Sequence, residues 1–246
     1  MKVCLTVDME QDCPPFLNSY RGVIDGTPAL LSVLAEEKIP ATFFTTGDVA
    51  RRFPETVEKI VQEGHELGCH GDSHRRFDQM NREEAASEID ISTKTLRHFY
   101  PVTSFRAPNL QFPAPYLSFL EKQGYALDSS EAKYKRREQD RAFRGSLHRV
   151  PASVTSSVLR LPKWFRYFYF RCLKEPVVLF VHPWEFVDWQ RSSLRLDCRF
   201  RTGAKALECL SENIHFFKRR GCQFVRLQEL TSSTEGQGGL NRNIPG

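Results

Sequence analysis

The sequence lacks the features of a membrane-spanning or exported protein. No apolar run approaches the roughly 18 residues that a transmembrane helix needs, and the first residues contain no basic segment followed by an apolar stretch. Signals of cysteine pairing are also missing, because the seven cysteines are odd in number, irregularly spaced and never arranged as Cys-x-x-Cys. These absences predict reduced thiols in a cytoplasmic protein.

Charge of one sign is not concentrated enough to indicate nucleic-acid binding. The net charge is +5 and the isoelectric point is near 8.8. This mild excess suits an anionic substrate or a membrane surface with anionic lipids, but no helix-turn-helix, zinc-finger or RNP-like pattern accompanies it. We therefore expect no nucleic-acid partner.

The 246 residues, 40% of them hydrophobic, suffice for one large domain with a full core. Short apolar runs predict strands, and amphipathic segments between them predict helices, one of which begins with Thr27 and another with Asn81 as N-cap. Expected strands cover 3–7, 41–45, 66–69, 104–106, 125–127, 147–151, 158–161, 177–181 and 223–226. Expected helices cover 27–37, 54–62, 81–99, 113–123, 162–173 and 203–219. We expect residues 131–144 to form a charged, exposed excursion, and residues 231–246, rich in Gly and Ser, to form a disordered tail after a domain at 1–230.

Alternation of strands and helices predicts parallel βα units, either as an α/β barrel or as an open doubly wound sheet. In a barrel, chemistry is located at the carboxyl ends of the strands. Polar residues end or directly follow five of the expected strands: Asp8, His70, Arg106, Asp128 and His182. A shared site explains this placement better than a solvated rim does.

The pair His70 and His74 is the strongest metal signal. Imidazole is the commonest protein ligand for transition metals, and two histidines with one carboxylate leave open positions for catalysis. A second carboxylate, such as Asp8, could then act as general base and another histidine, such as His182, as general acid. Arg106 could fix the carboxylate of Asp8 through a bidentate pair.

Five motifs extend the argument beyond single residues. They are TVDME at 6–10, HGDSH at 70–74, FRAP at 105–108, LDSS at 127–130 and FVHPWE at 180–185. In these motifs the chain resembles the polysaccharide deacetylases with a NodB-homology domain, carbohydrate esterase family 4. The resemblance implies a single-domain α/β fold, a distorted (β/α)7 barrel, and metal-dependent hydrolysis of an N-acetyl group from an amino sugar or glycan precursor.

The resemblance also implies roles for individual residues. Asp8 takes the place of the general base, His182 that of the general acid, and Arg106 that of the residue paired with the base. His70 and His74 take the places of ligands to a divalent metal, with zinc expected.

The first motif departs from the family pattern. Many members have a second aspartate after the base, and that aspartate binds the metal, whereas this chain has Met9. We expect Glu10 to be the third ligand, with Asp12 as the alternative.

Further residues of the motifs are expected to contact the substrate. They are Asp128, Pro108 and Trp184, whose aromatic face would suit a sugar ring. For Asp128 a structural role at the barrel rim stays open, and Glu185 could orient His182.

The sequence also fits functions other than deacetylation. One alternative is an amidase of the same superfamily that opens a small cyclic amide of the allantoin type. Another is an inactive barrel that only binds glycan, which would require the loss of Asp8 or His182. The combination of His70, Asp72 and His182 also fits a non-haem iron oxygenase, but those enzymes usually have all-β barrels.

The aromatic and basic segment from Lys163 to Arg171 has two interpretations. It is a helix packed on the barrel, or it is a face for peripheral contact with the inner side of the membrane. A cytoplasmic member of the family would act on a precursor, such as a lipid-linked or nucleotide-linked sugar. The sequence is also compatible with an oligomer.

Overall fold

The protein is described by a computed structural model that covers residues 1–135 and 145–231. Its centre is one sheet in which all strand pairs are parallel, in the order β6-β5-β4-β3-β2-β1-β7, with β8 paired to the start of β1. The strands are β1 Lys2–Met9, β2 Thr42–Thr45, β3 Glu66–Cys69, β4 Ser104–Phe105, β5 Leu127–Asp128, β6 His148–Arg149, β7 Val177–Val181 and β8 Gln223–Phe224.

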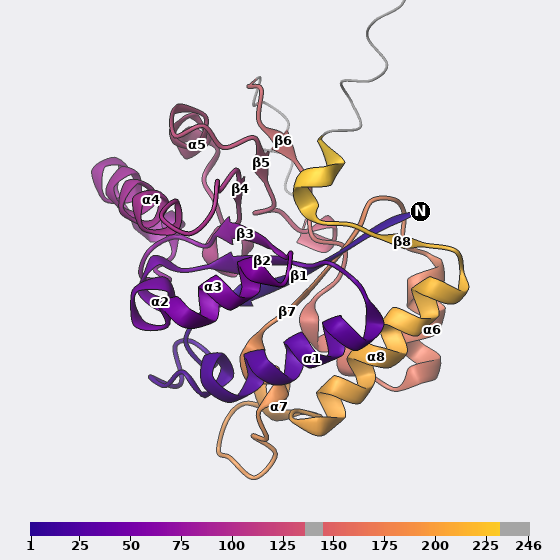
Figure 1. Cartoon of the computed structure of the whole chain (residues 1–246). Coiled ribbons are helices and arrows are strands. Elements are labelled where there is room, and N and C mark those ends of the chain that lie inside the picture. Colours follow the sequence, from indigo (N-terminus) through magenta and orange to yellow (C-terminus); the bar gives the residue numbers. More distant parts are fainter. Residues whose placement is uncertain (136–144, 232–246) are drawn as a thin grey trace, which may run out of the picture.

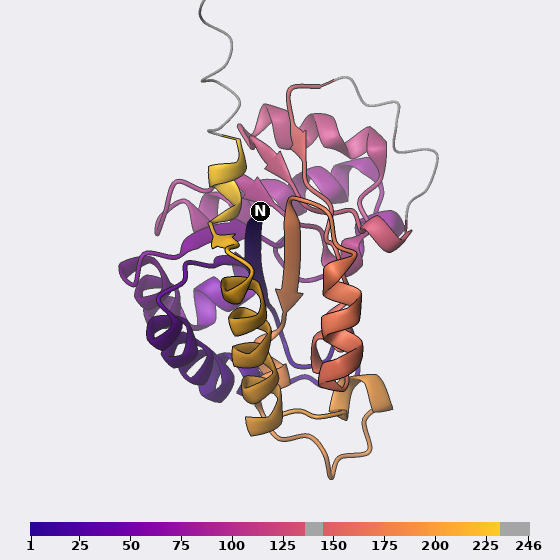
Figure 2. The same cartoon turned by 90° about the vertical axis from the view of Figure 1, so that its right-hand side faces the viewer.

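Helices surround the curled sheet (Figure 1). They are α1 Thr27–Glu37, α2 Gly47–Arg52, α3 Pro54–Gln62, α4 Arg82–Leu96, α5 Leu117–Lys122, α6 Lys163–Arg171, α7 Leu196–Arg199 and α8 Ala204–Arg219. The helix α6 lies beside α8 and β7 on the outside (Figure 2), where Arg166 donates to the carbonyl of Cys209 at 3.0 Å. None of the helices in the two described ranges is long and apolar enough to cross a membrane.

The two ends of the sheet, β6 and β7, approach each other through the chain that follows β6. The amide of Ser153 donates to the carbonyl of Val178 at 2.8 Å, and the amide of Val178 donates to the hydroxyl of Ser153 at 3.0 Å. These bonds curl the sheet into an incomplete barrel. The prediction of a distorted parallel α/β barrel in one domain is confirmed.

The alternation of side chains along β1 explains why this strand carries polar groups. Successive side chains of a strand point to opposite faces. Val3, Leu5, Val7 and Met9 belong to the buried cluster shared with the surrounding helices, while Cys4 packs in a separate cluster with Phe44 and Val178. Thr6 and Asp8 share the face of Cys4, so the barrel interior receives the polar half of the strand.

Several local expectations need correction. Residues 158–161 are not a strand but part of a short 3-10 helix, Ser156–Arg160, in which Leu159 and Arg160 are buried. Thr27 is not an N-cap, because a π-helical turn at Gly22–Gly26 runs directly into α1. Asn81 does cap α4, through a reciprocal pair of hydrogen bonds with Glu84 at 2.9 Å. The predicted excursion is described only up to residue 135, and the predicted tail at 231–246 lies outside the described residues except for Thr231.

An aromatic cluster supports β4 from outside the barrel. Phe105 is fully buried, with ring centroids 5.8, 5.1 and 5.6 Å from those of Phe77, Phe112 and Tyr125. Phe105→Ala is expected to cost about 3–5 kcal/mol of unfolding free energy, the usual loss for a buried phenylalanine, measured by urea denaturation. Phe168→Ala, at a side chain that is 66% exposed, should cost less than about 0.5 kcal/mol. Equal losses in the two variants would contradict this account of the core.

Candidate active site

The candidate site lies at the carboxyl ends of the strands, where three side chains form a cluster that could hold a metal ion. Glu10, directly after β1, meets His70, directly after β3, and His74, four residues further on. One ligand atom from each residue lies within 4.8 Å of the others. Two imidazoles and one carboxylate are a donor set that suits a divalent transition metal.

Hydrogen bonding determines which nitrogen of His70 faces the cluster. The Nδ1 atom lies 2.8 Å from the carbonyl oxygen of Arg106, which can only accept, so Nδ1 carries the proton. In the neutral ring, the Nε2 lone pair then points toward Glu10 Oε2, 3.3 Å away. Two acceptors that face each other at this distance favour a cation between them, and the backbone contact of His70 is the usual way to orient a metal-binding histidine.

The carboxylate of Glu10 is charged. It also pairs with His74 Nε2 and lies 3.8 Å from His182 Nε2. Burial alone would raise the pKa of Glu10, but the charge of His74 and the hydrogen bond from this histidine hold it well below its usual value. An anionic carboxylate is the form that binds a metal.

Asp12, the alternative ligand, is directed elsewhere. It is fully buried, and its two carboxylate oxygens accept from the amides of Arg21 and Gly22 at 2.8 and 2.7 Å and from the hydroxyl of Ser19 at 2.6 Å. The structure therefore brings Glu10, and not Asp12, to the two histidines.

Asp8 is held by Arg106 inside the barrel. Arg106 is fully buried and donates through Nη1 to Asp8 Oδ1 at 2.7 Å and to the hydroxyl of Thr6 at 2.7 Å. Its other nitrogens donate to the carbonyl and hydroxyl oxygens of Ser129 at 3.3 and 2.9 Å. The expected bidentate pair is thus wrong in detail, because the guanidinium is shared among three residues. In the described part of the chain, the other carboxylate oxygen of Asp8 accepts no hydrogen bond.

His182 follows β7 and is positioned by a chain of charged groups. Its Nδ1 lies 2.8 Å from Glu185 Oε1, and Glu185 Oε2 lies 2.9 Å from Nε of the buried Arg160. Burial alone would lower the pKa of His182, but the hydrogen bond to Glu185 and the charges of Glu10 and Glu185 raise it to about 9. The indole of Trp184 stacks on the imidazole, with ring centroids 4.9 Å apart.

The residues expected to bind substrate are buried. Asp128 has no exposed side-chain surface, and it accepts from Arg149 Nε at 3.1 Å and from the amide of Ser130 at 3.1 Å. Burial raises its pKa, against the opposing effects of Arg149 and Ser130. Contact between Asp128 and a substrate is not supported by this geometry, which gives the residue a structural role at the rim. Pro108 is buried and Trp184 is 7% exposed.

Sequence reasoning missed three supporting residues: Thr6, Ser129 and Arg160. Thr6 could have been found, because it shares the inward face of β1 with Asp8. Nothing in the sequence marks Arg160, which lies in the strand expected at 158–161.

Comparisons with known proteins identify the family to which the chain is similar. The family described as polysaccharide deacetylase matches residues 2–127. A chitooligosaccharide deacetylase from Sinorhizobium fredii is 32% identical over 80 residues, which are 32% of this chain and 37% of that protein. A peptidoglycan-N-acetylglucosamine deacetylase from Bacillus cereus is 33% identical over 100 residues, or 41% of this chain and 34% of that protein. Each match thus spans little more than a third of the relative.

A solved structure extends the likeness to nearly the whole chain. The Bc1960 peptidoglycan N-acetylglucosamine deacetylase superposes with a TM-score of 0.64 at 21% identity, covering 93% of this chain and 86% of that one. At this identity the superposition speaks for the fold alone. Because the family match covers just over half of its residues, the chain belongs to the polysaccharide deacetylase family.

Proposed function

We propose that the protein is a metal-dependent hydrolase that removes the N-acetyl group from an amino sugar or glycan precursor. The observation that carries this proposal is the convergence of Glu10, His70 and His74 with the Asp8–Arg106 pair and the His182–Glu185 pair. The names of the relatives, which refer to chitooligosaccharides and peptidoglycan, support the substrate class.

The chain's own residues account for the proton transfers. A divalent cation held by Glu10, His70 and His74, with zinc as the expected metal, would polarise the acetyl carbonyl and acidify a water molecule. Asp8 removes a proton from the attacking water, and Arg106 keeps its carboxylate in place. His182 donates a proton to the amide nitrogen as the C–N bond breaks, which yields acetate and a free amine.

Acetate release tests this function. The zinc-loaded protein is incubated with N-acetylglucosamine oligomers, a nucleotide-linked N-acetylated sugar and a lipid-linked one, and acetate is quantified with an enzyme-coupled assay. Release from at least one of them is expected. Ring opening of allantoin-like amides without any acetate release would favour the cyclic-amidase alternative, and tight glycan binding without turnover would favour the inactive barrel.

The pH dependence tests the role of Glu185. His182 must be protonated to act as an acid, so activity is expected to fall as pH rises through its pKa. Glu185→Gln removes the charge that raises this pKa, so the alkaline limb of the kcat/KM profile should move to lower pH, toward the ordinary value of 6.5. The exposed Glu83→Gln on α4 is the control and should leave the profile in place. An unshifted limb in Glu185→Gln would argue against His182 as the acid.

The outer face of α6 supports contact with an anionic lipid surface. Arg166 and Phe170 are buried against α8, whereas Trp164 and Phe168, one helical turn apart, are 75% and 66% exposed. Within the described part of the chain, the nearby cations at 171, 174, 219 and 220 have no carboxylate at ion-pair distance. Exposed aromatic groups with unpaired cations complement an anionic membrane, as a lipid-linked substrate would require of a cytoplasmic enzyme.

Vesicle sedimentation tests this contact. The protein should pellet with phosphatidylglycerol vesicles at low salt and stay in solution with phosphatidylcholine vesicles. The double variant Trp164→Ala/Phe168→Ala should lose binding without losing thermal stability. Equal partition of parent and double variant would contradict the proposal, and concentration-dependent dimerisation that the double variant abolishes would assign the face to a second copy.

A further inference from the structure

The loop between the two site histidines has a backbone that needs support from outside. Gly71 has φ +76° and His74 has φ +58°. A left-handed conformation is common for glycine but costs free energy at a histidine. Contacts that hold residues 71–73 therefore help to decide where the imidazole of His74 points.

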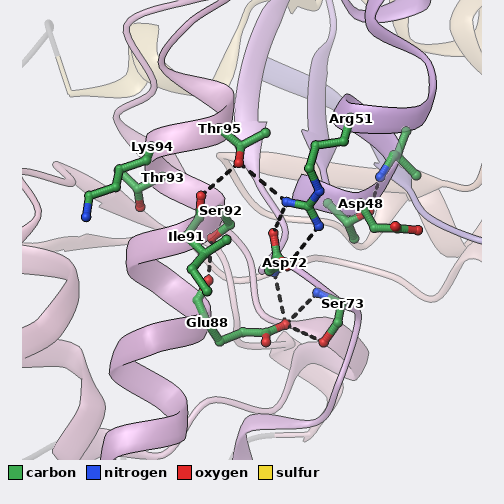
Figure 3. Close-up of polar contacts among 12 residues, drawn as sticks. Asp48, Arg51, Asp72, Ser73, Glu88, Ile91, Ser92, Thr93, Lys94 and Thr95 are labelled. Carbon is green, nitrogen blue, oxygen red and sulfur yellow. Dashed lines mark hydrogen bonds and ion pairs between the residues drawn. The ribbon is translucent and has the colours of Figure 1, made fainter.

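Part of this support comes from α2. The amides of Gly47 and Asp48 donate to the carbonyls of Gly71 and Asp72, both at 3.0 Å. Arg51 donates two hydrogen bonds of 2.6 and 2.9 Å to the carboxylate of Asp72 (Figure 3).

The remaining support comes from one carboxylate on α4. Glu88 Oε1 accepts three hydrogen bonds, from the amides of Asp72 and Ser73 at 3.0 and 2.6 Å and from the Ser73 hydroxyl at 2.8 Å. Figure 3 shows Glu88 reaching from its helix to Asp72 and Ser73. The residue is only 9% exposed, and in the two described ranges no arginine or lysine forms an ion pair with it. The carboxylate of Glu88 thus accepts mainly from backbone N–H groups. Hydrogen bonds to a carboxylate are stronger than those between neutral groups.

We propose that Glu88 is a positioning residue that sets the metal affinity of the Glu10–His70–His74 cluster. It acts through the 71–73 loop, which it holds in the conformation that points His74 at Glu10. The inference rests on the metal site of the proposed function. It goes further in assigning part of the site's affinity to a side chain on another helix.

Zinc affinity is the direct test. It is measured on the full-length protein by competition with a chromophoric chelator, after the metal has been removed. Glu88→Ala is expected to weaken zinc binding about 10- to 100-fold, the usual effect of losing a group that supports a ligand. Glu88→Gln keeps one accepting oxygen and loses only the charge, so a smaller loss is expected. Glu83→Ala, an exposed glutamate on the same helix, should bind zinc like the parent.

Two further measurements separate positioning from general damage. The visible absorption of the cobalt-substituted protein reports ligand geometry and should change in Glu88→Ala but not in Glu83→Ala. At saturating zinc, kcat of both Glu88 variants should return to within a few-fold of the parent, because Asp8 and His182 are unaltered.

The outcomes that overturn the inference differ from those that overturn the function. Parent-like zinc affinity and cobalt spectrum in both Glu88 variants would overturn the positioning role and leave the metal site intact. If Glu88→Ala does not fold, parent-like affinity in Glu88→Gln together with an unchanged cobalt spectrum decides against it. A parent protein that binds neither zinc nor cobalt would overturn the metal site itself.

Discussion

Asp8→Asn is expected to lower kcat by about 10²- to 10⁴-fold, the range that a general base contributes. The amide has the size of the carboxylate, and its oxygen can still accept the 2.7 Å hydrogen bond from Arg106. The fold and the metal cluster should therefore persist, while the group that takes the proton from water is lost. The measurement is kcat for acetate release at saturating zinc, together with the zinc content of the dialysed variant.

Ser129→Ala is the matched control for this variant. It removes the 2.9 Å hydrogen bond from Arg106 to the Ser129 hydroxyl and leaves the carboxylate of Asp8 untouched. A loss of less than about tenfold in kcat is expected, because the hydrogen bonds from Arg106 to Asp8 and to the Ser129 carbonyl remain. Parent-like activity in Asp8→Asn would refute its role as base, and loss of zinc in that variant would instead make Asp8 a ligand.

The placement of the site at strand ends was predictable because it follows from periodicity and topology. Parallel strands bring their carboxyl ends to one edge, and a period of two residues decides which side chains enter the barrel. Asp8, His70, Arg106 and His182 all obey this rule. Their chemical types indicated a metal site with an acid and a base, and the resemblance of the five motifs to a known family then implied hydrolysis.

Contacts made by loops and helices were harder to predict from the sequence. Arg160 sits in an apolar stretch that has the pattern of a strand, yet the stretch is helical and the guanidinium reaches Glu185. Glu88 has the appearance of a solvent-facing charge on an amphipathic helix, but its carboxylate is buried against the 71–73 loop. In both cases the partner is distant in the chain, so local propensity carries no signal for it.

The choice between Glu10 and Asp12 shows the same limit within three residues of chain. Glu10 and Asp12 lie two and four residues after Asp8, so a continued strand would direct all three side chains to the same face. The strand β1 ends at Met9, however, and beyond it the two carboxylates point in different directions. Beyond that point the chain is shaped by the segment at residues 19–22, which leads into the helical turn Gly22–Gly26 and whose amides and hydroxyl donate to Asp12. A strand pattern cannot specify where a side chain points once the strand has ended.

Glu10→Gln should therefore weaken metal binding strongly, whereas Asp12→Asn should not. Loss of a direct ligand removes an anionic donor from a three-residue cluster, so we expect zinc affinity to fall by at least about 100-fold, the upper end of what a supporting group contributes. Asp12→Asn should keep zinc affinity within a few-fold of the parent. It should lower unfolding free energy by about 1–3 kcal/mol instead, because an amide cannot accept all the bonds that the buried carboxylate accepts. Chelator competition and urea denaturation of both variants measure the two quantities side by side. Zinc loss in Asp12→Asn with normal zinc binding in Glu10→Gln would reverse the ligand assignment, and it would require the loop after β1 to rearrange when metal binds.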